Sequence, residues 1–114
     1  MGYDEKLADR IREIVAATGN IIEEKKMFGG LCFMVNQKMC VGVEKDRLMV
    51  RLDPGMYDQL LEKEGVHPME FTGKPMKGYV FVDVDALKSK KQLEYWMTLA
   101  IEFNKVAKSS KKKK

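Results

Sequence analysis

Hydrophobic residues near the two ends of the chain recur at the three- and four-residue spacing of an amphipathic helix. In the N-terminal segment, residues 3–18, the apolar positions are Leu7, Ala8, Ile11, Ile14 and Val15. In the C-terminal segment, residues 89–103, they are Leu93, Trp96, Met97, Ala100 and Ile101. Asp4 is a candidate N-cap for the first helix, and Ser89 with Gln92 three residues later forms a capping-box signature for the second. The pattern therefore predicts one amphipathic helix near each end.

Between these helices the pattern changes to short apolar runs separated by polar or glycine-containing turns. The runs cover residues 21–28, 31–35, 39–43 and 47–52. In the last run the apolar residues alternate with other side chains, in the order Arg47, Leu48, Met49, Val50, Arg51 and Leu52. A period of two is typical of a strand with one face on the core and the other in water. The runs predict an antiparallel meander with one covered side.

The segment that follows combines a helix signal, a turn and one more strand. Asp53 followed by Pro54 is typical of an N-cap with proline at the first helical position, and Gly65 would end a helix of about three turns. His67 and Pro68 lie in a loop-like stretch, and residues 71–75 have turn chemistry. Residues 79–83 are β-branched or aromatic and predict a strand.

These elements predict an α+β, two-layer fold. We expect an antiparallel β-sheet of about five to six strands, N- and C-terminal amphipathic helices and a short middle helix. No internal repeat or linker divides the chain. One domain is therefore expected over residues 1–104, followed by a lysine-rich, disordered tail over residues 105–114.

The positive charge of the chain is concentrated in that tail. The chain has a net charge of +4, from 21 Lys and Arg against 17 Asp and Glu. Six of the lysines fall in residues 105–114, which contain no acid, so residues 1–104 carry 15 bases and 17 acids, a net charge of −2. A domain that neutralises phosphates should have a basic face of its own. The charge distribution therefore favours a solvated tail over a nucleic-acid-binding domain.

Two features bear on the cellular compartment. No apolar run reaches the ~18 residues that a membrane span needs. The first residues are charged and contain no apolar signal-peptide core. We expect a cytoplasmic protein that does not contact the membrane.

Residue types that could carry chemistry are few and poorly spaced. The two cysteines, Cys32 and Cys40, and the single histidine, His67, fit no zinc-binding spacing. Neither cysteine has an evident activating neighbourhood, and a free cysteine is usually a small buried hydrophobic residue. Gly29 and Gly30 are followed by a strand rather than by a helix start, so they favour a bend or bulge over a phosphate loop. The sequence predicts no catalytic residue, no metal ligand and no cofactor.

A mixed surface patch is the best candidate for binding. Met49 lies between Arg47 and Arg51 on the expected wet face of a strand, which makes it the best candidate for an exposed contact among the nine methionines. Lys74 and Lys77 would extend this patch. Methionine is an adaptable side chain at binding surfaces, although most methionines fill gaps in cores.

Several separated motifs resemble one known family. They are Met27-Phe28-Gly29-Gly30-Leu31 with Phe33, Leu48-Met49-Val50-Arg51, and Pro68-Met69 to Phe71-Thr72-Gly73-Lys74-Pro75-Met76 with Gly78-Tyr79-Val80. In order and spacing the series resembles the TfoX (Sxy) N-terminal domain family from about residue 3 to residue 103. The resemblance implies helices packed on an antiparallel sheet and kinship with regulators of bacterial natural competence. It implies no catalysis.

The motif residues themselves have structural explanations. They are Met27, Phe28, Gly29, Gly30, Phe71, Gly73, Pro75 and Gly78. Glycines are required where the backbone turns or bulges, and the remaining residues suit a core. The family pattern supplies no catalytic or ligand residue.

Three functional readings follow. The leading one is a non-enzymatic module that acts through an unidentified protein partner in transcriptional regulation, and a homodimer is compatible with it. The alternative is direct nucleic-acid binding through the lysine tail with Arg47, Arg51, Lys74 and Lys77. A cysteine-dependent enzyme that uses Cys32 or Cys40 is the third.

Removal of residues 105–114 should leave the fold intact, because the apolar stripe of the last helix ends by about residue 103. The thermal unfolding temperature of the truncated chain checks this expectation. A large loss of thermal stability would contradict it.

Overall fold

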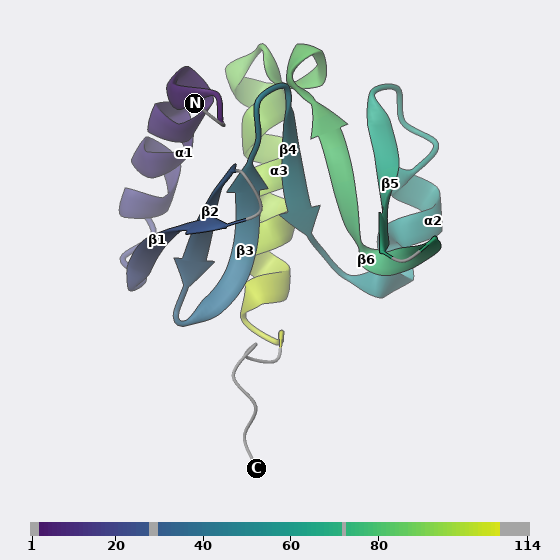
Figure 1. The fold of residues 1–114 in the computed structure, drawn as a ribbon. Helices are drawn as coiled ribbons and strands as arrows, with labels where there is room; N and C mark the ends of the chain where they lie inside the picture. Colours follow the sequence, from purple (N-terminus) through teal and green to yellow (C-terminus); the bar gives the residue numbers. More distant parts are fainter. Residues whose placement is uncertain (1–2, 28–29, 72, 108–114) are drawn as a thin grey trace.

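The computed structural model describes residues 3–27, 30–71 and 73–107, and they form one six-stranded sheet with helices on one face. The helices and strands in chain order are α1 (Glu5–Ala16), β1 (Ile22–Met27), β2 (Gly30–Val35), β3 (Lys38–Val43), β4 (Arg47–Arg51), the 3₁₀ turn η1 (Pro54–Met56), α2 (Tyr57–Leu60), β5 (Val66–Phe71), β6 (Lys74–Asp83), η2 (Val84–Leu87) and α3 (Lys90–Asn104). The strand order is β1-β2-β3-β4-β6-β5, and every pairing is antiparallel. The predicted α+β fold is confirmed (Figure 1).

Helix α1 begins where the sequence predicts and covers the first edge of the sheet. The side chain of Asp4 accepts a hydrogen bond from the backbone N–H of Leu7 at 3.1 Å, which caps the first turn. On the outer side, the guanidinium of Arg12 donates two hydrogen bonds to the carboxylate of Glu24 on β1, at 2.8 and 2.9 Å. This contact lowers the pKa of Glu24. The paired charges hold the helix over the edge strand.

The β2–β3 hairpin differs from its sequence prediction in loop length and in register. Asn36 and Gln37 have φ angles of 53° and 69°, which makes them a two-residue turn of the type that matches strand twist. A bulge then pairs Met34 with Met39 and leaves Cys40 in the core. The polar residues 36–38 between two apolar runs predict a three-residue loop that would pair Cys32 with Gly42 and Met34 with Cys40; the first pair is present, and the second is not.

The middle helix is shorter than predicted. Asp53 does cap it, because its side chain accepts a hydrogen bond from the N–H of Gly55 at 2.8 Å. However, the segment consists of the 3₁₀ turn η1 and the four-residue helix α2 in place of about three α-helical turns. The chain has to reverse into the edge strand β5, and Gly65 turns it with a φ of +82°.

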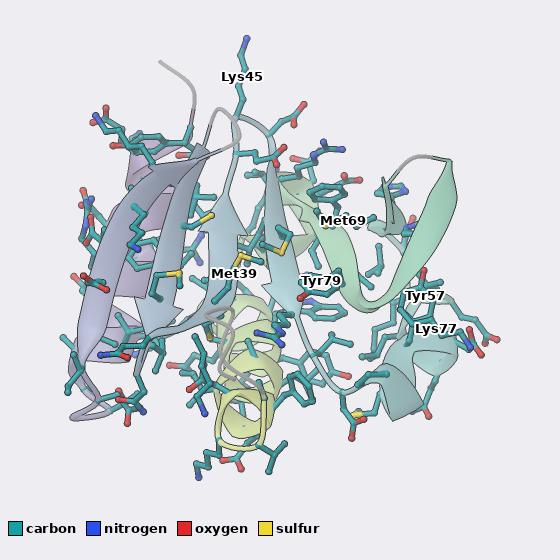
Figure 2. All side chains as sticks on the ribbon, turned by 60° about the horizontal axis from the view of Figure 1, so that its bottom comes forward. Met39, Lys45, Tyr57, Met69, Lys77 and Tyr79 are labelled. Atoms are coloured by element: carbon teal, nitrogen blue, oxygen red, sulfur yellow. The ribbon has the colours of Figure 1, made fainter. Side chains whose placement is uncertain are left out.

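His67 and Pro68 were expected in a loop, and this expectation is wrong, since both belong to β5. Proline is tolerated there because β5 is the last strand of the sheet, where one side needs no ladder hydrogen bonds. A register shift between Pro68 and Glu70 adds an irregularity. Strand β6 starts at Lys74, five residues before the predicted start, and its ribbon bends part-way along (Figure 2).

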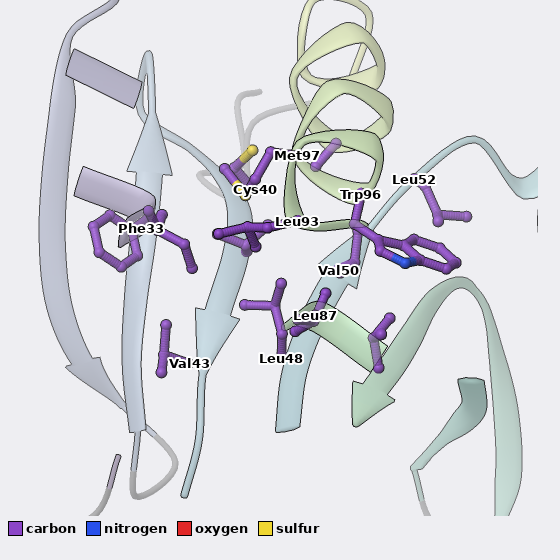
Figure 3. Close-up of a cluster of buried hydrophobic side chains, with 14 of the residues drawn as sticks. Phe33, Cys40, Val43, Leu48, Val50, Leu52, Leu87, Leu93, Trp96 and Met97 are labelled. Atoms are coloured by element: carbon purple, nitrogen blue, oxygen red, sulfur yellow. The ribbon is translucent and has the colours of Figure 1, made fainter. Parts of the chain in front are cut away.

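Helix α3 supplies the centre of the core. Ser89 and Gln92 form the predicted capping box, with both reciprocal hydrogen bonds present. Figure 3 shows Leu93, Trp96 and Met97 of this helix facing the strand residues Leu48 and Val50. Trp96 is only 4% exposed and packs edge-to-face on Tyr95, with ring centroids 5.2 Å apart. Trp96 therefore lies on the buried side of the helix, as its place in the apolar spacing predicts.

Replacement of Trp96 by alanine should lower the free energy of unfolding by about 3–5 kcal/mol, because it leaves a large cavity beneath the sheet. Tyr95→Ala is the matched control, since Tyr95 is 41% exposed and its loss should cost far less. Urea denaturation followed by far-ultraviolet circular dichroism measures both. Equal destabilisation by the two variants would contradict the assignment.

Candidate interaction surface

The face of the sheet opposite the helices carries the residues that the sequence singled out for binding. We call it the open face. One row of it runs across the strands, as the pairing register shows: Lys25, Cys32, Gly42, Met49, Phe81 and His67. None of the three helices covers this face, and Figure 2 views it with Met39 and Tyr79 toward the reader.

Arg47 stacks on an aromatic ring at one end of the open face. Its guanidinium carbon lies 3.6 Å from the ring centroid of Phe81. The same guanidinium donates a hydrogen bond to the carboxylate of Glu44 at 2.8 Å. A cation over an aromatic face gains about 0.5–1 kcal/mol at an exposed site. The two contacts fix the plane of Arg47 while its side chain stays 43% exposed.

Arg51 occupies the other end of β4. Its guanidinium carbon lies 5.7 Å from the ring centroid of Tyr79 and 5.7 Å from that of Phe103 at the end of α3. Lys77 is exposed and lies two residues before Tyr79 in β6, and Gly78 between them has a φ of +95°. Arg47 and Arg51 thus both stand over aromatic side chains on the same face. The side chain of Lys74 is outside the described part of the structure.

Met49 is buried, and the expectation that it is an exposed contact is wrong. It lies on the open face between the two arginines, but only 4% of it is accessible. Its neighbours in the row are Gly42 and Phe81, and its side chain fills the room that Gly42 leaves. The alternation of side chains along the strand correctly predicted which face of the sheet carries Met49, but it incorrectly predicted that Met49 is exposed.

A small cavity lies beside Met49 on the open face. It has a volume of about 50 Å³. Its lining includes four sulfur-bearing side chains, from four different strands: Cys32, Met39, Met49 and Met69. Met39, Met69, Tyr79 and Phe81 are not among the binding residues that the sequence predicts, although Met69 and Tyr79 belong to the motif series quoted above.

A larger, shallower groove lies on the helix side, at the start of α3. Its volume is about 430 Å³, and its lining residues are Lys63, Glu64, Ala86, Lys91, Gln92, Tyr95 and Trp96. The ammonium of Lys63 lies 5.0 Å from the ring centroid of Tyr95. Lys63 and Lys91 are exposed, so the groove places two surface charges beside the exposed ring of Tyr95.

The two cysteines and the histidine, whose spacing in the sequence fits no zinc site, do not lie together in the structure. Cys32 is on the open face, whereas Cys40 belongs to the core cluster on the helix side. His67 is on β5, where its Nε2 lies 3.0 Å from the carboxylate of Asp83. Among the described residues, no group of three or more His, Cys, Asp or Glu side chains could hold a metal ion.

Both thiols are buried and free, and neither is activated. Burial raises the pKa of Cys40 to about 12, although the charge of Arg51 opposes this rise. Burial also raises the pKa of Cys32, and the carboxylate of Glu44 adds to the effect. A nucleophilic cysteine needs the opposite, a lowered pKa. Burial therefore works against a nucleophilic thiolate at either position.

The family model of the TfoX N-terminal domain matches residues 13–104. The chain belongs to the TfoX N-terminal domain family. No curated protein and no solved structure gives a significant match to it.

Two glycines of the TfoX N-terminal domain motifs have clear structural requirements. A Cβ atom on Gly30 would collide with the carbonyl oxygen of Val43 on the neighbouring strand. Gly78 has a φ of +95°, and a Cβ there would lie 3.2 Å from the carbonyl oxygen of Leu52. Gly73, in the β5–β6 turn, has a φ of +80°. Of the remaining motif positions, Phe28 and Gly29 lie outside the described residues.

The described residues of this TfoX N-terminal domain include no helix long and apolar enough to cross a membrane.

Both thiols should react slowly with iodoacetamide in native protein at about pH 8, because a raised pKa leaves little thiolate at that pH. In denaturant both should react at the rate of an ordinary cysteine. Peptide mass spectrometry resolves the two sites. A native thiol that alkylates quickly and titrates well below ~8.5 would contradict the buried assignment and revive the enzyme reading.

Proposed function

We propose that this chain is a non-enzymatic protein-interaction module of a competence-regulator type, and that it recognises a protein partner through the open face. The observation that carries the proposal is the pair of arginines held over aromatic rings, Arg47 on Phe81 and Arg51 beside Tyr79. Membership of the TfoX N-terminal domain family supports the regulatory setting. That family is not known as a family of enzymes.

The chemistry of the open face indicates what kind of protein surface fits it. Arginine and tyrosine are enriched among residues that dominate binding energy at interfaces. A guanidinium that already lies flat on a ring loses little rotamer freedom when it binds a carboxylate. The partner therefore presents carboxylates to Arg47, Arg51 and Lys77, next to apolar side chains that cover the aromatic rings.

The net charge of residues 1–104 argues against binding to a phosphate backbone, because it is −2 and such binding needs an excess of cations. The guanidinium of Arg47 already donates to the carboxylate of Glu44 at 2.8 Å, so part of the positive charge of the open face is neutralised within the domain. The lysines at positions 108–114 lie outside the described residues.

The double variant Arg47→Gln/Arg51→Gln should lose the partner. The matched control is Lys90→Gln/Lys91→Gln, which removes the same charge from two exposed positions at the start of α3. Affinity capture with quantitative mass spectrometry, followed by a binding titration of each captured protein, tests the pair. We expect a protein that the wild type and the control bind alike and that the double arginine variant binds at least ~tenfold more weakly, an effect of ~1.4 kcal/mol.

Two results would overturn the proposal. In the first, the arginine variant binds the same proteins as the wild type with equal affinity. In the second, duplex DNA binds with a slope of log affinity against log salt of about −4 or steeper, which would favour the nucleic-acid alternative. Circular dichroism spectra of all variants establish that loss of binding does not reflect loss of folding.

A further inference from the structure

The small cavity on the open face is lined by one cysteine and three methionines, and the function proposed above gives these four residues no role. Cys32 from β2, Met39 from β3, Met49 from β4 and Met69 from β5 line the same space of about 50 Å³. The other lining residues are Gly30, Leu31, Gly42, Val43 and Glu44. Apart from Glu44 the side chains are apolar or sulfur-bearing, and the four sulfur-bearing residues come from four separate strands.

The backbone makes room for this cavity. A Cβ atom on Gly42 would lie 3.3 Å from the methyl carbon of Met49 and 3.4 Å from the sulfur of Cys32. Cys32 and Met49 thus flank the glycine from the two neighbouring strands. The bulge between Phe33 and Met34 sets Met39 opposite Met34. Met69 sits at the register shift of β5 and lines the cavity from the far edge of the sheet.

We propose that this cavity is a binding site for a soft monovalent metal ion, Cu(I), with the thiolate of Cys32 and the thioethers of Met39, Met49 and Met69 as its ligands. Thiolate and thioether sulfurs are the ligand types that select Cu(I). The proposal is independent of the function proposed above.

Charge balance favours a monovalent ion over a divalent one. On binding, a bond forms between copper and the sulfur of Cys32, and the thiol proton passes to the solvent. One thiolate and one Cu(I) give a neutral centre, and the thioethers add no charge. A neutral centre can be buried among apolar residues at little desolvation cost, whereas Zn(II) with the same ligands would leave an uncompensated positive charge. Glu44 does not supply that compensation, because it is paired with Arg47.

The volume of the cavity and its access from the surface also fit an ion. Its volume of about 50 Å³ exceeds the about 10–15 Å³ that one water molecule needs. A buried water also needs two or more polar partners, which the sulfur lining does not provide. Cys32 and Met49 are buried at the bottom, whereas Met39 and Met69 are only half-buried. The two half-buried thioethers therefore mark the route by which an ion enters.

An anaerobic competition titration with Cu(I) held by bicinchoninate tests the site. We expect the wild-type chain to remove one Cu(I) per molecule from the chelator. The double variant Met39→Leu/Met69→Leu preserves side-chain volume, so it should fold normally and bind at least ~tenfold more weakly. Cys32→Ala should abolish binding. The matched controls are Cys40→Ala and Met97→Leu, which change a thiol and a thioether in the core on the helix side and should bind as the wild type does.

Two outcomes would overturn the metal site. One is a wild-type chain that removes no Cu(I) from bicinchoninate at any ratio. The other is a folded Met39→Leu/Met69→Leu variant that binds as tightly as the wild type, since the thioethers would then be only packing groups. Tighter binding of Zn(II) than of Cu(I) would refute the charge argument and the ion assignment with it. The methyl resonances of the methionines give an independent readout, because those of Met39, Met49 and Met69 should shift on titration and that of Met97 should not.

Discussion

The three helices of the described residues lie on one face of the six-stranded sheet. The other face therefore has no helix layer over it, and its own side chains must shield it from water. A sheet with one covered side normally places polar side chains on its second face. Here the second face instead carries Cys32, Met34, Met49 and Phe81, which are all buried. The long side chains at its rim, above all Arg47 on Phe81, therefore do the shielding that a helix layer would otherwise do. The candidate interaction surface is a direct consequence of this constraint.

One glycine and two register shifts shape the open face. Gly42 has no side chain and so leaves space between Cys32 and Met49. The register shifts in the β2–β3 and β5–β6 pairs change which side chains meet there. A bulge increases local twist and redirects a side chain without ending the strand. The space left by Gly42 and the two register shifts together set which residues line the sulfur-lined cavity.

Charge and chemistry are divided between the two faces. On the helix side, the core is apolar, and its buried thiol, Cys40, has a strongly raised pKa. On the open face, Arg47 is paired with Glu44, and Nε2 of His67 lies 3.0 Å from the carboxylate of Asp83, at the ends of the strands. Recognition on the open face therefore uses cations and aromatic rings, while burial raises the pKa of both thiols. This division favours binding over covalent chemistry.

Local signals in the sequence determined the elements whose stability is local. The cap at Asp4, the capping box at Ser89 and the three- and four-residue spacing of Leu93, Trp96 and Met97 predicted helices that the structure contains, because capping and amphipathic burial depend on residues within one or two turns. The motif series predicted the family. The assignment of Arg47, Met49 and Arg51 to one face of a strand was also correct, since side chains alternate along any strand.

The tertiary structure decided what depends on partners far away in the chain. Strand β5, with His67 and Pro68, forms only because β6 offers it a free edge, and no local pattern shows that edge. Met49 is buried because Gly42 and Phe81 stand beside it, 7 and 32 positions away in sequence. The stacking of Arg47 on Phe81 and the meeting of four sulfur-bearing residues from four strands likewise follow from strand order and register. Alternation tells which face a side chain takes, but exposure is set by the neighbouring strands, and these are chosen when the sheet assembles.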